Sequence, residues 1–267
     1  MINLHYNLKY MVDIQLVLLG IFVYFINKIY NYFSKISSIN KLTLNKSIFI
    51  ITSHGCQCKK NYKYFPFIKC TKCLIPSMID FENINDVYRM LSHLNNKNCH
   101  LIIHTEGGES SCADLISRLL SEKKMYVKTY VPKYAQSAGT MMAICGNKIF
   151  MNWYSIMGPI DTQLDYDEDD TYSAKYIKNF KKKNWAKEKD YLRGLEADAV
   201  HNDDEFLLDK ILANNPYKDK IINRLLNTKY SHSMSYTRDD IREMGLPVTN
   251  DVPHNITKIF NIFEALF

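Results

Sequence analysis

The chain has 267 residues, of which 46% are hydrophobic and 23% charged, with seven cysteines and a formal net charge of +6. This length is sufficient to bury a sizeable core, so we expect one folded domain with an N-terminal extension. The basic excess lies in short lysine runs, which favours a solvated helix face, or attraction to an anionic membrane surface, over nucleic-acid binding. An odd cysteine count argues against a complete disulfide framework and fits a reducing compartment.

The first apolar segment runs from Ile14 to Ile26 and reads IQLVLLGIFVYFI. It is shorter than the ~20 apolar residues that span a bilayer without strain, but tyrosines suited to an interface and Lys28 accompany it. No small-x-small cleavage site follows, so we predict an uncleaved single-pass anchor at residues 1–33; a cleaved signal peptide is disfavoured, and an interfacial or core helix is the alternative. Lysines are more numerous after the segment than before it, which places the folded domain on the cytoplasmic side.

A linker rich in Ser, Asn and Lys, residues 34–46, precedes the folded domain, which we place at residues 47–267. The domain opens with the apolar run 47–52, which predicts a buried strand.

Two close cysteine pairs follow that run, with His54 beside the first pair. Four thiolates can form a tetrahedral structural zinc site, although a Cys-x-Cys pair is tighter than the usual knuckle. Four unligated thiols are the alternative. The four cysteines are Cys56, Cys58, Cys70 and Cys73.

The next part of the chain alternates helical and strand patterns. Because right-handed crossovers turn such repeats into a parallel sheet with helices outside, the pattern indicates an α/β fold. The expected elements are a helix over 80–94, a strand over 101–104, a helix over 111–120 and a strand over 125–131.

The C-terminal half predicts mostly helices. An acidic and then strongly basic stretch, 165–189, suggests a charged helical hairpin. Apolar spacing between residues 203 and 227 predicts two short helices separated at Pro216. Thr237 is expected to cap a helix that ends at Gly245, and a terminal helix covers 256–267.

Three sharp backbone features follow apolar runs and so should meet at one sheet edge. Gly107-Gly108 can turn backbone N–H groups toward an oxyanion. Ser137, which opens a short helix, is placed like a nucleophile at a helix N-terminus. Gly158-Pro159 forms the third turn. A plain turn and an N-cap are the alternatives for the first two, but their occurrence together is more specific.

The segments HTEGG, YAQSAGT, MGPIDTQ and YSHSMSYTRDDIREMGLPV resemble the serine dehydrogenase proteinase family of the Clp protease/crotonase superfamily, a more distant relative of signal peptide peptidase A. The resemblance implies a Clp protease/crotonase-like ββα spiral with a mainly parallel sheet and outer helices, here preceded by an N-terminal hydrophobic helix. It also implies a membrane-anchored serine peptidase that forms a homo-oligomer, acts on a peptide or protein substrate and needs no cofactor for catalysis. Glu106 departs from the family, which usually has proline there, and puts a carboxylate near the expected oxyanion pocket.

This resemblance assigns Ser137 as the nucleophile. The N–H groups of Gly108 and Ala138 would hold the oxyanion, and Gly107 would shape the turn. A catalytic domain of this kind hydrolyses peptide bonds through an acyl-enzyme. Two other functions stay open: a catalytically inactive membrane scaffold, and a crotonase-type acyl-thioester hydrolase or hydratase that would not need Ser137.

The general base is a lysine or a histidine. Peptidase A relatives supply a lysine downstream of the serine, in a region that corresponds to Lys175–Lys189, where we select Lys178 and Lys182 although both resemble surface lysines. His232 is the competing base, because histidine titrates in the range a base needs; a polar contact behind the final helix is the alternative. Asp161 either orients a base or caps a turn.

Overall fold

A computed structural model describes residues 23–24, 26–31, 33–35, 37, 48–52, 98–122, 124–165, 171–180, 188–226 and 231–264. Within these ranges, none of the helices combines the length and the apolar character that a membrane span requires. The described residues between 23 and 37 are helical and carry exposed apolar side chains, whereas residues 14–22 of the expected anchor and the helix expected over 80–94 lie outside the described residues.

The centre of the domain is a five-stranded sheet with the order β1-β2-β3-β5-β10, in which every neighbouring pair is parallel. This confirms the predicted α/β fold with a mainly parallel sheet. The strands are β1 (Ile48–Thr52), β2 (Asn98–His104), β3 (Tyr126–Val131), β5 (Lys148–Met151) and β10 (Val248–Thr249).

Alternating side chains cover both faces of this sheet. Leu101 and Ile103 of β2 face one side and join the core formed with α4 (Ser110–Glu122) and α5 (Ala138–Ile144). Ile102, between them, joins the other core, which α10 (His254–Glu264) completes. Successive strand residues point to opposite faces, so a nearly continuous apolar strand is buried on both sides, as the sequence predicts.

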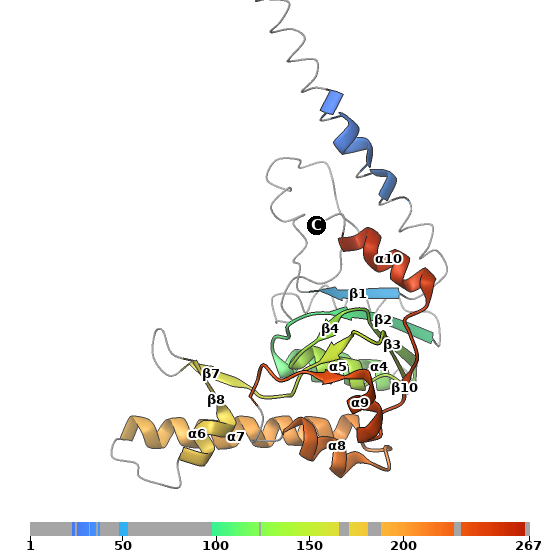
Figure 1. Cartoon of the computed structure of the whole chain (residues 1–267). Coiled ribbons are helices and arrows are strands. Elements are labelled where there is room, and N and C mark those ends of the chain that lie inside the picture. The colour runs from blue at the N-terminus through green and yellow to red at the C-terminus, as the bar shows by residue number, and fades with distance from the viewer. Residues whose placement is uncertain are drawn as a thin grey trace, which may run out of the picture.

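A layer of helices lies beyond α4 and α5. Figure 1 shows α7 (Glu188–Ile211) crossing the domain, with α6 (Ala174–Phe180) at one end and α8 (Lys218–Leu225) at the other. The chain breaks near Pro216, as expected, but the first helix is 24 residues long and not short. Before residue 203, the buried positions of α7 include Gly194 and Ala197, and large apolar side chains are exposed, so this part lacks the apolar period that reveals a helix.

The prediction of a charged helical hairpin over 165–189 is wrong in its first half. Antiparallel strands β7 (Gln163–Asp165) and β8 (Thr171–Ser173) open this stretch, and α6 follows directly. Leu164 and Tyr172 pair across the two strands. Such cross-strand pairs stabilise a hairpin, and charge pattern alone does not reveal them.

A small second sheet joins β4 (Tyr134–Ala135), β6 (Ile156–Met157) and β9 (Tyr236–Thr237). Helix α9 (Arg238–Met244) follows β9 directly. Thr237 caps it through a capping box with Asp240, and Gly245 ends it in the left-handed conformation at φ 106°. Both helix signals predicted from the sequence are confirmed.

Replacing Thr237 by alanine is expected to lower the free energy of unfolding by about 1 kcal/mol, because the Asp240 N–H loses its acceptor. Chemical denaturation measures the change. Thr237→Ser keeps the hydroxyl and should retain most of the stability, whereas an equal loss in both variants would contradict a capping role.

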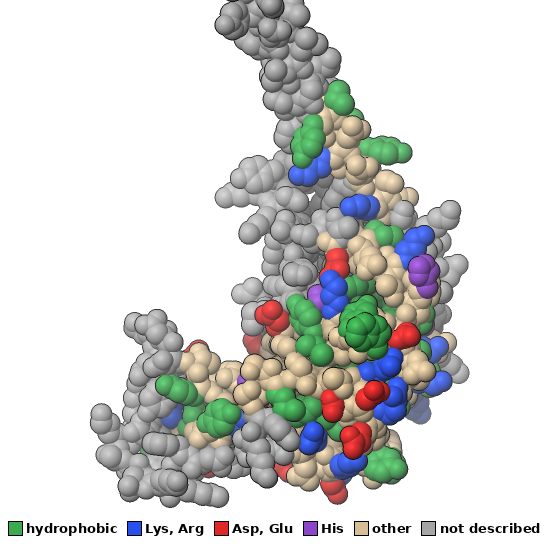
Figure 2. Space-filling view, in the orientation of Figure 1, with side chains coloured by type: hydrophobic (Ala, Val, Ile, Leu, Met, Phe, Trp, Pro, Cys, Tyr) green, Lys and Arg blue, Asp and Glu red, His purple; other side chains and the backbone are tan. Residues whose placement is uncertain are grey.

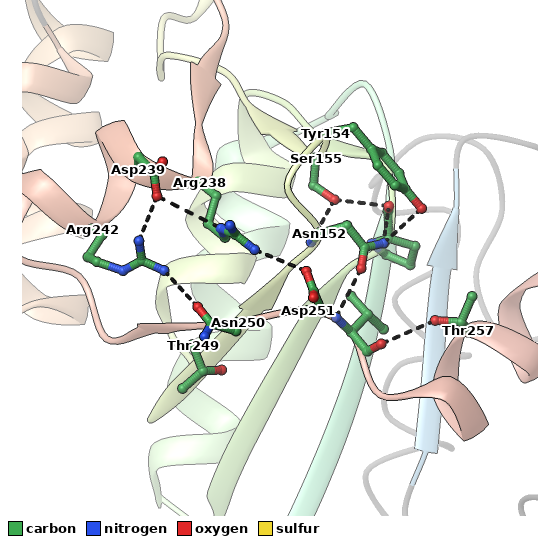
Figure 3. A network of polar contacts seen from close by, with 12 residues as sticks. Asn152, Tyr154, Ser155, Arg238, Asp239, Arg242, Thr249, Asn250, Asp251 and Thr257 are labelled. Carbon is green, nitrogen blue, oxygen red and sulfur yellow. Dashed lines mark hydrogen bonds and ion pairs between the residues drawn. The ribbon is translucent and has the colours of Figure 1, made fainter.

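Polar contacts tie the loop after β5 to the C-terminal segment (Figure 3). The Asn152 amide donates to the Pro132 carbonyl at 3.0 Å and accepts from the Val252 N–H at 3.0 Å. Arg238 reaches Asp251 at 3.0 Å. These bonds fix the segment that leads into α10.

Acidic and basic side chains are interspersed on the face shown in Figure 2. The net charge of +6 therefore does not gather there into a surface of one sign. Interspersed charges of this kind fit a solvated surface.

Candidate active site

Ser137 occupies a strained turn between β4 and α5. Its backbone has φ 51° and ψ −120°, and among the described non-glycine residues only it and Lys124 have positive φ. Such a conformation costs roughly 1–3 kcal/mol and is typical of active sites, including the strand-to-helix turns that present a nucleophilic serine. Ser137 is the N-cap residue of α5, but its side chain makes no capping hydrogen bond and is partly exposed.

The diglycine turn lies directly against this serine. Beyond β2, the Thr105 N–H donates to the Tyr134 carbonyl at 3.3 Å, and the Gln136 N–H donates to the Thr105 carbonyl at 3.0 Å. A Cβ added to Gly107, whose φ is 125°, would lie 2.8 Å from the Ser137 Cβ. Only glycine fits there, because both the close approach and the left-handed backbone exclude a side chain.

The sequence predicts the Gly108 and Ala138 N–H groups as the oxyanion donors. The Gly107 N–H donates to the Thr105 hydroxyl at 3.1 Å, so it is used within the turn. Ala138 is the first residue of α5, and the first N–H groups of a helix have no acceptor within the helix. Gly108 follows with φ 143°. The sequence therefore places Gly108 and Ala138 on the two loops that the structure brings together.

The Gly158 turn joins the same cluster. Its N–H donates to the Ala135 carbonyl at 3.0 Å, and the Thr140 hydroxyl lies 2.9 Å from the carbonyl oxygens of both Ala135 and Gly158. The three turns that the sequence singled out thus meet around Ser137.

Asp161, three residues after Gly158, is buried and gathers several side chains. Its Oδ1 accepts from the Ser173 hydroxyl at 2.6 Å, and its Oδ2 lies 3.2 Å from the Lys175 Nζ and 3.9 Å from the His232 Nδ1. Lys175 is only 2% exposed, while His232 is 37% exposed. A fully buried lysine is rare, and here it is paired with a buried carboxylate.

Lys175 is the lysine of the stretch 175–189 whose side chain the structure describes. Lys178 lies further along α6 and its side chain is not described, and Lys182 lies outside the described residues. Their roles, and those of His232 and Asp161, stay predictions. Residue pattern could place a base in this lysine-rich stretch, but it held no signal for which lysine is buried.

The cysteines offer no competing nucleophile among the described residues. Cys99 and Cys112 are buried in the core as predicted, and burial raises the pKa of the Cys145 thiol to about 11. A thiol with so high a pKa is protonated and unreactive at neutral pH. The four cysteines of the predicted zinc site lie outside the described residues, so that site stays a prediction. The described part of the chain holds no other cluster suited to a metal.

Comparison with known proteins agrees with this geometry. Residues 6–266 match the family model described as ClpP-like SDH-type serine proteinase. The chain belongs to this family of serine proteinases. The resemblance inferred from the sequence motifs is thereby confirmed.

Two other proteins are similar in sequence to this family member. Two uncharacterized proteins of Methanocaldococcus jannaschii are each 27% identical to it; the matches cover 61% and 70% of the chain, and 56% and 66% of those proteins. The chain thus spans less than two thirds of the length of these relatives.

Two structures of the 1510-N membrane-bound stomatin-specific protease share the fold. The first has a TM-score of 0.51 and 14% identity, covering 79% of this chain and 83% of that one. The second, a lysine-to-alanine variant with a substrate peptide, has a TM-score of 0.50 and 15% identity, covering 80% of each chain. Similarity at this level of identity establishes the Clp-protease-like fold.

Proposed function

We propose that the chain is a serine peptidase in which Ser137 attacks a peptide carbonyl and Lys175, in its neutral form, accepts the Ser137 proton. The observation that supports this most strongly is the strained Ser137 turn packed against the diglycine turn. A Cβ added to Gly107 would lie only 2.8 Å from the Ser137 Cβ. Family membership supports the same reaction class.

The oxyanion would form between the two loops. As the Ser137 Oγ bonds to the carbonyl carbon, the carbonyl oxygen becomes negative and accepts hydrogen bonds from the Gly108 and Ala138 N–H groups. Preorganised backbone donors of this kind contribute about 3 kcal/mol each to transition-state stabilisation. The amine leaves with the proton from Lys175, and water then hydrolyses the acyl-enzyme.

We choose Lys175 as the base because its side chain is buried and lies against the buried carboxylate of Asp161. Asp161 lies 3.2 Å from its Nζ and is placed to stabilise the ammonium that forms when the lysine takes the proton, as the aspartate of a catalytic triad stabilises imidazolium. Serine-to-alanine and lysine-to-alanine variants of the 1510-N protease, the latter with a substrate peptide, offer a parallel for a serine paired with a lysine, and their spacing along the chain corresponds here to Lys178. His232 is the competing base.

The test is labelling of the full chain with a fluorophosphonate probe, together with cleavage of an unfolded protein substrate. We expect a stoichiometric adduct that peptide mass spectrometry maps to Ser137. An assembled, folded protein that forms no adduct and cleaves nothing would favour the inactive scaffold. Turnover of an acyl-CoA without any adduct would favour the crotonase-type alternative.

We further propose that residues 14–26 anchor the protein in a membrane with the catalytic domain on the cytoplasmic side. The apolar run and the lysines after it support this, as does the description of the 1510-N relative as membrane-bound. The full chain should remain in the membrane pellet after alkaline carbonate extraction, while a chain of residues 34–267 should be released. Release of both would exclude an anchor.

A homo-oligomer is proposed from the surface of α6 and α7. These two helices contact each other and carry exposed apolar side chains, which mark interaction surfaces when they lie together. They are Tyr176, Tyr191, Leu192 and Leu195. Light scattering after size-exclusion chromatography would give the assembly mass, and a monomeric mass would contradict the proposal.

A further inference from the structure

One buried carboxyl beside the proposed site has no part in the reaction as described so far. Asp204, on α7, is 2% exposed, and its Oδ2 accepts from the Thr162 hydroxyl at 2.8 Å. Thr162 directly follows Asp161. Ser110, the first residue of α4, also stabilises the charged form of Asp204 through its hydroxyl. This side chain is therefore in contact with the Asp161 loop and close to the start of the helix that follows the diglycine turn.

We propose that ionised Asp204 is a positioning residue for the Ser137–Lys175 reaction, acting through Asp161 and Thr162; this rests on the proposed function. Its carboxylate fixes the loop that carries Asp161 and, with it, the side chain of Lys175. A fixed Asp161–Lys175 pair favours the charged transition state, because preorganised groups aimed at developing charge need no reorganisation.

Several charged and polar groups surround Asp204, and protonation of its carboxylate would change its interactions with them. Asp161 faces it from the loop after β6, and Lys175 of α6 is bound to Asp161. Thr162 and Ser110 contribute hydroxyls. On α7 itself the neighbouring acids, Asp203 and Glu205, point to solvent. Asp204 Oδ1 has no hydrogen-bond partner among the described residues.

Burial raises the pKa of Asp204 to about 6, and the negative charge of Asp161 adds to the rise, while hydrogen bonds from Thr162 and Ser110 oppose it. Asp204 is therefore mostly ionised above that pH and mostly neutral below it. The charge of Asp204 therefore changes within a pH range that an activity assay can cover, so its positioning role can be measured.

The decisive experiment compares the pH profiles of kcat/KM for the wild type and Asp204→Asn. At pH 8 the variant should be at least about 10-fold slower, the effect of losing a charge-assisted contact. Below about pH 6 the wild type should lose activity more steeply than the variant, and the two profiles should converge, because protonated Asp204 resembles the asparagine. A purely structural role would instead separate the profiles by a constant factor at every pH.

Two further variants keep the inference falsifiable. Asp203→Asn, its exposed neighbour on the same helix, should leave the profile unchanged. Thr162→Val removes a hydrogen bond that lowers the pKa of Asp204, so the steep part of its profile should begin at higher pH. This variant also answers the question if Asp204→Asn does not fold.

Parallel profiles for Asp204→Asn, or an unmoved profile for Thr162→Val, in an enzyme whose activity depends on Ser137 would overturn the positioning role and leave the peptidase assignment intact. A wild type without Ser137-dependent activity would overturn both.

Discussion

Replacing Ser137 by alanine is expected to abolish peptide hydrolysis, with kcat/KM falling at least about 10⁴-fold, because no other described group is placed to form the acyl-enzyme. The hydroxyl makes no capping hydrogen bond, so the substitution should change the free energy of unfolding by less than about 0.5 kcal/mol. Steady-state assays and thermal unfolding of the same preparation measure both quantities.

The matched control is Ser233→Ala, which removes the hydroxyl of an exposed serine and should retain full activity and full probe labelling. Hydrolysis or labelling that persists unchanged in Ser137→Ala would refute the assignment of the nucleophile. Acyl-CoA turnover that survives the same substitution would point to crotonase chemistry in the same pocket.

The diglycine turn and Ser137 could be predicted from the sequence because their signals are local. A diglycine after a buried strand and a serine before a short helix restrict the backbone wherever they occur. Parallel strands then bring their ends to one edge of the sheet, so Gly107 and Ser137 meet although they are distant in the chain. The helix from Thr237 to Gly245 was predictable for the same reason, since both of its ends carry their own signals.

The polar part of the site could not be predicted in this way. The sequence gives no sign of the burial of Lys175 against Asp161, which depends on how α6 packs after the β7–β8 hairpin. Asp204 contacts Thr162 from 42 residues away, and the apolar spacing that predicts its helix does not reveal this contact. Tertiary contacts of this kind leave no pattern in a single sequence.

Replacing Lys175 by arginine is therefore the sharpest test of the base. Arginine can keep an ion pair with Asp161, but its guanidinium stays protonated and cannot accept the Ser137 proton. We expect kcat to fall about 10³-fold, the usual range for loss of general base catalysis, while the protein stays folded. Lys175→Met should be equally inactive and also less stable by about 3–5 kcal/mol, because it leaves Asp161 buried without its partner.

The competing bases are tested by Lys178→Met, Lys182→Met and His232→Ala, which should each retain kcat within about 3-fold if Lys175 is the base. The comparison of Lys175→Arg with Lys175→Met separates proton transfer from packing, since only the second variant loses the ion pair. An active Lys175→Arg enzyme together with an inactive His232→Ala would assign the proton transfer to His232, which lies 3.9 Å from the same Asp161 carboxylate. Asp161 would then orient a histidine, and the buried lysine would serve only to neutralise that carboxylate.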